Sequence, residues 1–584
     1  MPLWLPASGA TQAIEQQLYL CQAWHELLHP QSPDTFRARV VNLPLLLDDL
    51  LHVVEIASDD ARWTGYLPSL GSELEEHLLS EQRLIAPSSQ LWRAIESVVH
   101  DAKQQRVPTL KSKVLVSKGL FGSTENRFVP DLLDLVANQP NRKEGILSRL
   151  SSIASHIAYR GQTEEALDLL SRINLTDAPR DIAGNLCSLL SASQQIFACH
   201  LAVSGDREIL PLLLKRTPFR RVRENSLRDQ PNFANWAAEC SDCIFFKIDI
   251  KDYSHHSAAE KAMRTLSESL NIHNLYTNSA SFRVRSSVLI RNSSNAYSSV
   301  QVAPSSHFGL MPRSRALKLS IDRMSRVGKR VEGRLSNALE CHAIALAARE
   351  PTTALINLWT ALEAISGSAQ GISIGQKVSR SVAPIIASRR IDKIASYLAI
   401  SCHEMLVHNE HFVDRKALPH SQFTKVSNDD IMQAIAGPNN NAGMKYLLGI
   451  CQDSPMLRQR LYFVWKDFHD PDAVRKNLIA SRRRVEWQIE RIYRARNLIV
   501  HKGETSHLLW RLLQNAQYYV SATLSRILHD LSDHPEWGID ESLSYQEMQF
   551  NHVCSSLESG KGLSHADVLG SRTSAGALRL WQQP

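Results

Sequence analysis

Apolar residues recur three and four positions apart through residues 10 to 235, separated by short polar turns. The segments "LPLLLDDLLHVVEIA" and "TEEALDLLSRI" show this spacing clearly. It places the apolar side chains on one face of an α-helix. The pattern therefore predicts a mostly helical N-terminal region over residues 1–235. No second copy of "GQTEEALDLLSRI" occurs at a fixed period, so the sequence does not predict a helical solenoid.

The pattern changes at Cys243. The segments "CIFFKIDI" and "FRVRSSVLI" are rich in Phe, Val and Ile, which is typical of β-strands, and "SSVQVAP" follows them. Between the first two lies "SAAEKAMRTLSESL", in which one stripe at helical spacing consists of Ala259, Ala262, Met263, Leu266 and Leu270. These elements predict a small α/β module over residues 240–305.

Pro, Ser and Gly gather in "APSSHFGLMPRSRA", which indicates a domain boundary and a linker over residues 306–324. After it the helical pattern continues to about residue 532, so we expect one helical domain over residues 325–535. Residues 536–584 lose this periodicity and are expected to form a partly loose C-terminal tail. The predicted fold class is mainly α, with a C-terminal helical bundle preceded by the α/β module and the N-terminal helical region.

The composition is that of an ordinary globular protein: 584 residues, of which 43% are hydrophobic and 21% charged. No stretch has the roughly 18 uninterrupted apolar residues of a membrane span, so no membrane partner is expected. The first basic residue is Arg37, which argues against a secretory signal and favours the cytoplasm. Nine scattered cysteines do not resemble a disulfide framework and are expected to be reduced thiols.

Several short motifs fail on spacing. "SGKG" lacks the upstream glycine of a phosphate-binding P-loop, and the histidines of "HEMLVH" lie five residues apart where a zinc protease needs four. Cys240 and Cys243 form a single CxxC without a second pair, so burial at a strand start is the better interpretation. Accordingly, we expect no cofactor and no metal site.

The segment from Val485 to Leu513 carries the most chemistry. Val485, Ile489, Ile492 and Ile499 recur at helical spacing, and the position that completes this stripe is Arg496. The pattern therefore predicts an arginine in a core-facing position.

Asn497 and His501 are four residues apart and share a helix face beside that arginine. Gly503 is expected to end the helix, and Thr505 or Ser506 to cap the next one. Two interpretations stay open on spacing alone. Arg496, Asn497 and His501 form a catalytic group, or Arg496 pairs with a buried carboxylate while His501 stabilises a helix C-terminus.

The string Arg496-Asn497-Leu498-Ile499-Val500-His501 resembles the RN-x3-H form of the signature of HEPN domains. Upstream, "ALINLWTALEAISG" and "RLSNALECHAIALAAREP" resemble the ApeA-like HEPN branch, as does the "CIFFKIDIKDYSHHSAAEKA" module ahead of them. The resemblance covers about residues 240 to 530 and none of the first 235.

The resemblance implies a dimeric, metal-independent endoribonuclease whose RNA substrate is tRNA or mRNA. It also implies that the enzyme serves as a toxic effector of bacterial antiphage defence or abortive infection. The implied catalytic residues are Arg496, Asn497 and His501. In the supporting group, Glu363 either orients Arg496 or is simply solvated, Arg494 contacts phosphate, and Tyr493 either stacks on a base or belongs to the core. The net charge of +7 does not by itself indicate a nucleic-acid partner. We expect RNA contacts from the basic approach to the motif, namely Arg482, Arg483, Arg484 and Arg491.

A second function class stays open, in which the domain is a non-catalytic HEPN scaffold or nucleotide-binding module. Arg, Asn and His are all present in register, which favours the enzyme. A toxin neutralised by a nucleotidyltransferase is disfavoured, because the usual tyrosine two residues past the histidine is Gly503 here. The N-terminal region is expected to restrain the nuclease until a trigger, such as a phage-derived molecule, releases it.

Overall fold

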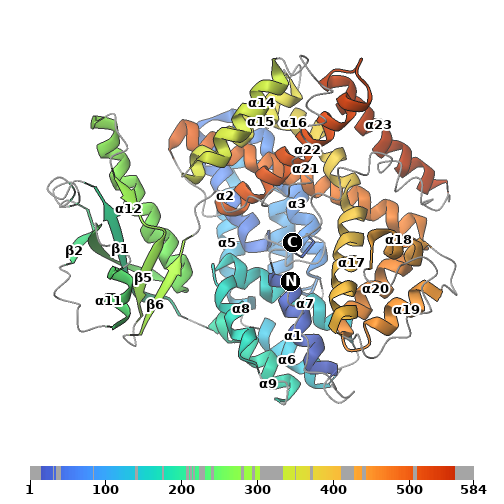
Figure 1. Cartoon of the computed structure of the whole chain (residues 1–584), viewed down its shortest axis with the longest axis horizontal. Helices are drawn as coiled ribbons and strands as arrows, with labels where there is room; N and C mark the ends of the chain where they lie inside the picture. The colour runs from blue at the N-terminus through green and yellow to red at the C-terminus, as the bar shows by residue number, and fades with distance from the viewer. Residues whose placement is uncertain are drawn as a thin grey trace.

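The computed structural model describes residues 15 to 559, except for residues 30–31, 34–40, 83–84, 126, 139–141, 174–176, 192, 206–209, 211–213, 215–216, 223–230, 239–242, 278–281, 293–295, 303–332, 349, 368–372, 409–425, 437–441 and 504–508. The described chain is mainly helical and contains one small antiparallel sheet, with helices before and after it (Figure 1). This confirms the predicted fold class.

The N-terminal region is helical up to residue 191, as its apolar spacing predicts. Asn42 and Ser89 cap two of its helices, since each side chain accepts a hydrogen bond from the backbone N–H three residues on. Short 3-10 turns, η2 (Ala61–Tyr66) and η3 (Ser188–Ser191), connect some of these elements. The α-helices are α1 (Glu15–Leu28), α2 (Leu43–Asp59), α3 (Leu67–Ser80), α4 (Gln90–Lys103), α5 (Val107–Glu125), α6 (Phe128–Asn138), α7 (Lys143–Tyr159), α8 (Thr163–Ser171) and α9 (Pro179–Cys187).

The sheet has the strand order β2-β3-β1-β5-β6, with β4 also paired to β1, and all of its pairings are antiparallel. Its elements are β1 (Gln195–Ser204), β2 (Arg220–Val222), α11 (Pro231–Ala238), β3 (Cys243–Asp252), α12 (His255–Thr277), β4 (Arg283–Val284), β5 (Ser287–Arg291) and β6 (Tyr297–Gln301). The strands and the helix predicted from Cys243 onward are therefore confirmed.

Helices cover both faces of this sheet. Alternate residues of a strand point to opposite faces, so Phe246 packs in the core beneath α12 whereas its neighbour Phe245 packs with Trp236 of α11. Ala259, Ala262, Leu266 and Leu270 of the predicted stripe are buried in the α12 core, and Met263 is partly buried there. Cys243 is buried at the first residue of β3, as expected, while Cys240 lies outside the described residues.

The boundary predicted for the α/β module is wrong, because β1, β2 and α11 all lie before residue 240. The central strand β1 spans Gln195–Ser204, inside the range assigned to the N-terminal helical region, and pairs with β3 along its whole length. The module therefore begins near residue 195 and not at 240. The segment "QIFACHLAVS" was missed because both of its faces are covered, so it lacks a polar alternation that would distinguish a strand from a buried helix.

The C-terminal part is helical throughout its described residues, and it continues further than expected. α23 is a regular helix within the range predicted to be a loose tail, so that prediction is wrong for residues 539 to 558; residues 560–584 and the predicted linker 306–324 lie outside the described residues. The helices are α14 (Arg334–Ala347), α15 (Pro351–Ser366), α16 (Ile374–Ser388), α17 (Arg390–His408), α18 (Asn428–Ala436), α19 (Ala442–Ile450), α20 (Pro455–Phe468), α21 (Pro471–Lys502), α22 (Leu509–Asp533) and α23 (Ile539–Glu558).

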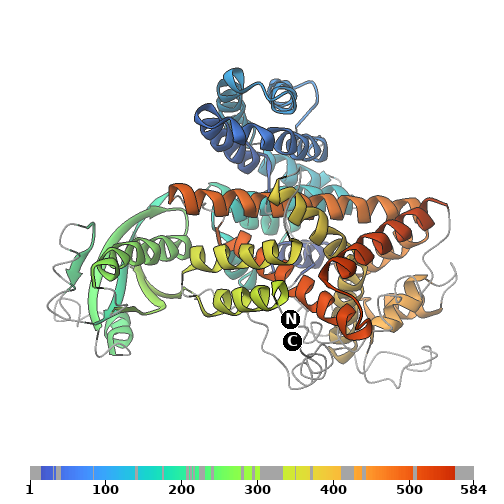
Figure 2. The same ribbon diagram turned by 90° about the horizontal axis from the view of Figure 1, so that it is seen from above.

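One hydrophobic core joins the two helical parts of the chain. It runs from Trp24 in α1 to Trp359 in α15, and includes α2 to α9 together with α14 to α16, α21 and α22. Figure 2 shows the long helix α21 running between the N-terminal helices on one side and α14 and α15 on the other. A second core is formed mainly by α17 to α20. The N-terminal helices and the predicted HEPN domain therefore share their interior.

No helix among the described residues is long and apolar enough to cross a membrane.

Candidate functional site

The helix α21 carries the predicted motif at its C-terminal end. Asp470 caps its start by accepting hydrogen bonds from the backbone N–H groups of Asp472 and Ala473, and Pro471 occupies the first turn. Gly503 ends the helix in the left-handed region, at φ 69°, and its N–H donates to the carbonyl of Ile499. The predicted helix end at Gly503 is confirmed, whereas Thr505 and Ser506 lie outside the described residues.

Arg496 does not occupy the core-facing position that the stripe predicts. Ile489 and Ile492 are fully buried, but the next buried apolar position is Ala495, and Arg496 itself is only half-buried. A helix turns once in 3.6 residues, so the position that follows Ile492 on the core side can lie three residues on as well as four. The small alanine fills the core side, and the guanidinium reaches the edge of the bundle.

Arg496 and Asn497 are joined directly. The Nη1 of Arg496 donates a hydrogen bond of 3.0 Å to the Oδ1 of Asn497, whose side chain is 9% exposed. The Nε of Arg496 is buried and donates no hydrogen bond to any described residue. The hydrogen bond to Asn497 holds the guanidinium in place.

His501 is exposed at the end of the same helix. Its imidazole makes no hydrogen bond or ion pair with the part of the chain that the structure describes, so it is not assembled into one cluster with Arg496 and Asn497. It stands one helical turn past Asn497, next to Val500, which is 45% exposed. Within a single chain the motif is therefore a joined Arg–Asn pair and a separate, accessible imidazole.

Glu363 forms a contact that the sequence did not suggest. Its Oε2 accepts a hydrogen bond of 3.1 Å from the indole Nε1 of Trp359, one turn earlier on α15. The carboxylate thus pairs with the buried tryptophan and stays partly exposed, with no hydrogen bond or ion pair to Arg496 among the described residues.

Tyr493 belongs to the core. Its ring lies 4.9 Å from that of Trp359 and 6.3 Å from that of Tyr66, measured between centroids. The backbone of α16 approaches it closely, because a Cβ added at Gly375 would lie 2.7 Å from the tyrosine Cδ1. Burial raises the pKa of the neighbouring Tyr66. Of the two interpretations of Tyr493, the structure supports core packing.

Arg491 and Arg494 are buried, which contradicts their predicted contacts with RNA. Arg491 donates from Nε to Asp49 and from Nη2 to Glu73, both at 2.7 Å. Arg494 is 4% exposed, with its Nη2 3.9 Å from Asp49 and its guanidinium over the ring of Tyr66.

Burial opposes the charge of both arginines. It lowers the pKa of Arg494, whereas at Arg491 the two carboxylates outweigh burial and raise the pKa. Both arginines therefore join α21 to α2 and α3 and are not available to a phosphate backbone.

The other predicted RNA contacts lie on α21 but are engaged as well. Arg482 donates to Glu486 at 3.0 Å and to Glu547 at 3.3 Å, and Arg483 forms an ion pair of 2.5 Å with Glu76. Arg484 is half-buried. The basic run is thus distributed around the helix, and most of its charge is matched within the protein.

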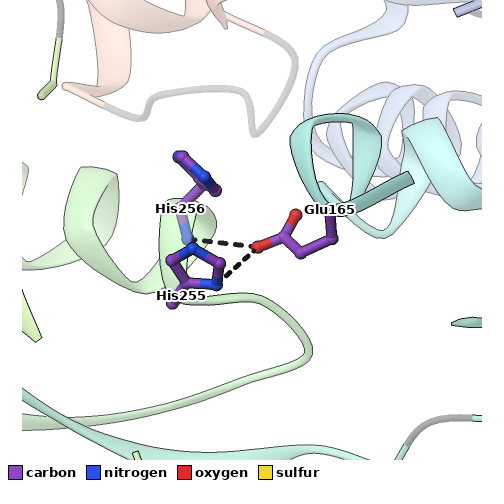
Figure 3. Close-up of side chains that lie close together, drawn as sticks. All are labelled: Glu165, His255 and His256. Carbon is purple, nitrogen blue, oxygen red and sulfur yellow. Dashed lines mark hydrogen bonds and ion pairs between the residues drawn. The ribbon is translucent and has the colours of Figure 1, made fainter. Parts of the chain in front are cut away.

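A second group of side chains meets where the helical body touches the α/β module (Figure 3). Glu165 of α8 lies against the first turn of α12, and its Oε1 is 3.0 Å from the Nδ1 of His255. Ser254 donates to the same oxygen at 2.6 Å, and one possible ligand atom from each of Glu165, His255 and His256 lies within 4.8 Å of the others. Burial alone would raise the pKa of Glu165, but the hydrogen bonds from His255 and Ser254 lower it.

Sequence reasoning missed this group because Glu165 is about ninety residues from the histidines. The adjacent pair His255-His256 is the one local signal. Two neighbouring histidines ahead of a helical stripe are common on protein surfaces, so the signal has no meaning until the fold supplies the carboxylate.

Comparison of the chain with protein-family models, curated proteins and solved structures finds no match.

Proposed function

We propose that the protein is a metal-independent HEPN endoribonuclease whose catalytic group is Arg496, Asn497 and His501. One observation carries the proposal: the motif stands at the exposed end of a long core helix, with a guanidinium held by an amide and an accessible imidazole one turn further on. Both kinds of group that RNA cleavage without a metal requires are therefore present at one end of α21.

The chemistry follows from the two side chains. His501 takes the proton of a ribose 2′-hydroxyl or gives one to the leaving 5′-oxygen, since an imidazole titrates near neutral pH. The 2′-oxygen attacks the adjacent phosphorus and the bond to the 5′-oxygen breaks, so a 2′,3′-cyclic phosphate and a 5′-hydroxyl form. Arg496 stabilises the extra negative charge on the phosphorane.

Within a single chain, no hydrogen bond among the described residues joins the imidazole to the guanidinium. The proposal therefore includes a homodimer in which the ends of two α21 helices meet across a two-fold axis, so that His501 of one chain and Arg496 of the other act on one phosphate. Val500, 45% exposed beside His501, supplies apolar surface for such a contact.

The N-terminal helices supply a means of restraint, which suits a toxic effector of antiphage defence in the cytoplasm. α3 contacts α21 through Ser69, which donates to Glu490 at 2.5 Å, and through the Glu76–Arg483 ion pair. A trigger that moves α3 would change the position of α21, and with it the approach of the two motif ends.

The alternative is a non-catalytic HEPN scaffold or nucleotide-binding module. The separation of His501 from Arg496 within one chain and the use of Glu363 by Trp359 favour it. The two functions differ in one measurable outcome, because a scaffold binds without cutting.

The test is to incubate the purified chain with total tRNA and mRNA in excess EDTA and to sequence the ends. The enzyme should leave 2′,3′-cyclic phosphate or 3′-phosphate ends. Intact RNA after long incubation with a dimeric, folded protein would support the scaffold. The variant His255→Ala serves as a control, since any effect of EDTA that acts through the Glu165–His255–His256 group should be absent from it.

A further inference from the structure

We propose that Glu165, His255 and His256 form a binding site for a divalent transition-metal ion of the Zn²⁺ type, which links the helical body to the α/β module. The three side chains come from α8 and from the first turn of α12, and their possible ligand atoms lie within 4.8 Å of one another. The site is independent of the RN-x3-H motif and does not rest on the proposed ribonuclease activity.

The backbone around the site is held from both sides. Ser254 caps α12, since its Oγ accepts from the N–H of Ser257 at 3.1 Å, and it also donates to Glu165. On the other side, Gly161 at φ +73° lets the turn before α8 approach α12 so closely that an added Cβ would lie 3.0 Å from the Cβ of Ser257. The carboxylate and the two imidazoles are therefore brought together by fixed backbone.

The two oxygens of Glu165 have different surroundings. Oε1 receives the Ser254 hydroxyl, lies 3.0 Å from His255 Nδ1 and is 3.4 Å from the backbone N of His256. Oε2 is buried and has no hydrogen-bond partner among the described residues. A buried carboxylate oxygen without a donor is unfavourable, so Oε2 is the natural ligand atom, while Ser254 orients the group through Oε1.

Completing the site requires the imidazole side chains to rotate. Ligands at about 2.0 to 2.1 Å from a tetrahedral Zn²⁺ lie roughly 3.3 Å apart, closer than the present spread of up to 4.8 Å. Figure 3 shows the His255 ring facing Glu165 and the His256 ring turned aside. Both rings are half-buried and not enclosed, so a change of rotamer can bring the second nitrogen to the same point.

The donor set selects the kind of ion. Two imidazole nitrogens and one carboxylate oxygen suit Zn²⁺, with a water molecule as the fourth ligand, whereas Mg²⁺ and Ca²⁺ prefer oxygen ligands throughout. The N-terminus of α12 disfavours a cation by its dipole. The Glu165 carboxylate, 3.0 Å from His255 Nδ1, supplies the opposing negative charge at the same place.

The ion would bridge two parts of the fold. Glu165 belongs to the helix next to α7 and α9 in the body, and the histidines begin the helix that covers the sheet. An ion that binds the folded chain stabilises it by mass action, and here the stabilised contact is the junction between the body and the module.

The experiment uses the full chain, stripped with EDTA and returned to chelator-free buffer. Calorimetry measures the binding of ZnCl₂, and a separate sample loaded with Co²⁺ gives the absorption spectrum of the bound ion. We expect one site whose affinity falls at least about tenfold in His255→Ala, His256→Ala and Glu165→Gln. Glu165→Gln keeps an acceptor for Ser254 and so protects the local fold. The matched control is His552→Ala, which removes an exposed histidine of α23.

Zinc should also raise the melting temperature of the wild type more than that of the three ligand variants. The Co²⁺ spectrum should lack thiolate charge-transfer bands, which separates this site from binding by cysteines. The proposal is overturned if the wild type binds no Zn²⁺ at micromolar concentration, if the ligand variants bind as tightly as the wild type, or if the spectrum reports thiolate ligands.

Discussion

Arg491 of α21 and Glu73 of α3 form an ion pair with an Nη2 to Oε2 distance of 2.7 Å, in which each side chain is 4% exposed. The two residues are 418 positions apart in sequence. Their pairing shows that the helix carrying the candidate catalytic motif is held by the N-terminal helices from within a shared interior.

Removing one partner of this pair should be strongly destabilising. Arg491→Met leaves Glu73 buried without its cation, and Glu73→Leu leaves the arginine in excess, so each should lower the free energy of unfolding by about 3 to 5 kcal/mol. The double variant should lose less than the sum, because neither the Glu73 nor the Arg491 charge then remains, and Asp49 keeps its contact with Arg494. Chemical denaturation of the four proteins measures this coupling. Arg483→Met, at a 53% exposed side chain, is the control and should cost less than about 1 kcal/mol. Strictly additive losses would contradict the interpretation.

Gly375→Ala should destabilise the bundle by about 1 to 3 kcal/mol. The new Cβ would lie 2.7 Å from Cδ1 of Tyr493, whose ring is confined by Trp359 and cannot move freely. Gly119→Ala is the matched control, since no atom lies within 4 Å of its added Cβ and alanine favours a helix. Thermal melting should show the first variant below the wild type and the second at or above it. Equal melting temperatures would mean that Tyr493 has room to shift.

The α/β module should lose stability as the pH falls from 6.5 towards 4, in part through His200. Burial, followed by the nearby Lys247 and Arg291, lowers the pKa of this histidine to about 4, and only Asp249 opposes them. The unfolded chain therefore takes up a proton at a higher pH than the folded chain, so the stability present above pH 6.5 is lost on acidification, by up to about 3 kcal/mol.

His200→Leu should remove this share of the pH dependence. Melting curves of variant and wild type between pH 4 and 7.5 give the difference in the pH dependence of their melting temperatures. The other histidines contribute equally to both proteins, so the difference reports His200. Parallel curves would show that His200 is protonated without penalty.

Arg496→Ala and His501→Ala should each reduce RNA cleavage by about 10² to 10⁴-fold. Both proteins should keep their melting temperature, because the first side chain is only half-buried and the second is exposed. The controls are Arg264→Ala and His552→Ala, which remove the same side-chain types from exposed positions elsewhere. Cleavage at the wild-type rate in either motif variant would refute the catalytic assignment, and unfolding of both would favour a packing role.

Residues 320 to 535 expressed alone should not form a stable domain. Their core is continuous with that of α1 to α9, so the fragment would expose a large apolar surface and the unpaired Arg491 and Arg494. Solubility and near-ultraviolet circular dichroism measure this. A monodisperse, cooperatively melting fragment would show that the N-terminal helices are a separable attachment. A test of restraint is therefore better made in the full chain, by comparing RNA cleavage of Ser69→Ala with that of the wild type.

The sequence by itself determined the local structure. Apolar spacing located the helices before residue 192 and from 334 to about 532 and the strands after Cys243, and Gly503 marked the end of α21, because these signals act between residues only a few positions apart. It also identified Arg496, Asn497 and His501 as neighbours on one helix, since a helix fixes which residues share a face.

Only the tertiary structure decided which side chains are buried and what they meet. Arg491 appears in the sequence as one more residue of a basic run, and becomes a core residue because Asp49 and Glu73 are brought to it from α2 and α3. Glu165 likewise acquires its histidines by the docking of α8 on α12. The periodicity of a helix shows that one face is covered but carries no information on the element that covers it, and burial of a charge depends on that element.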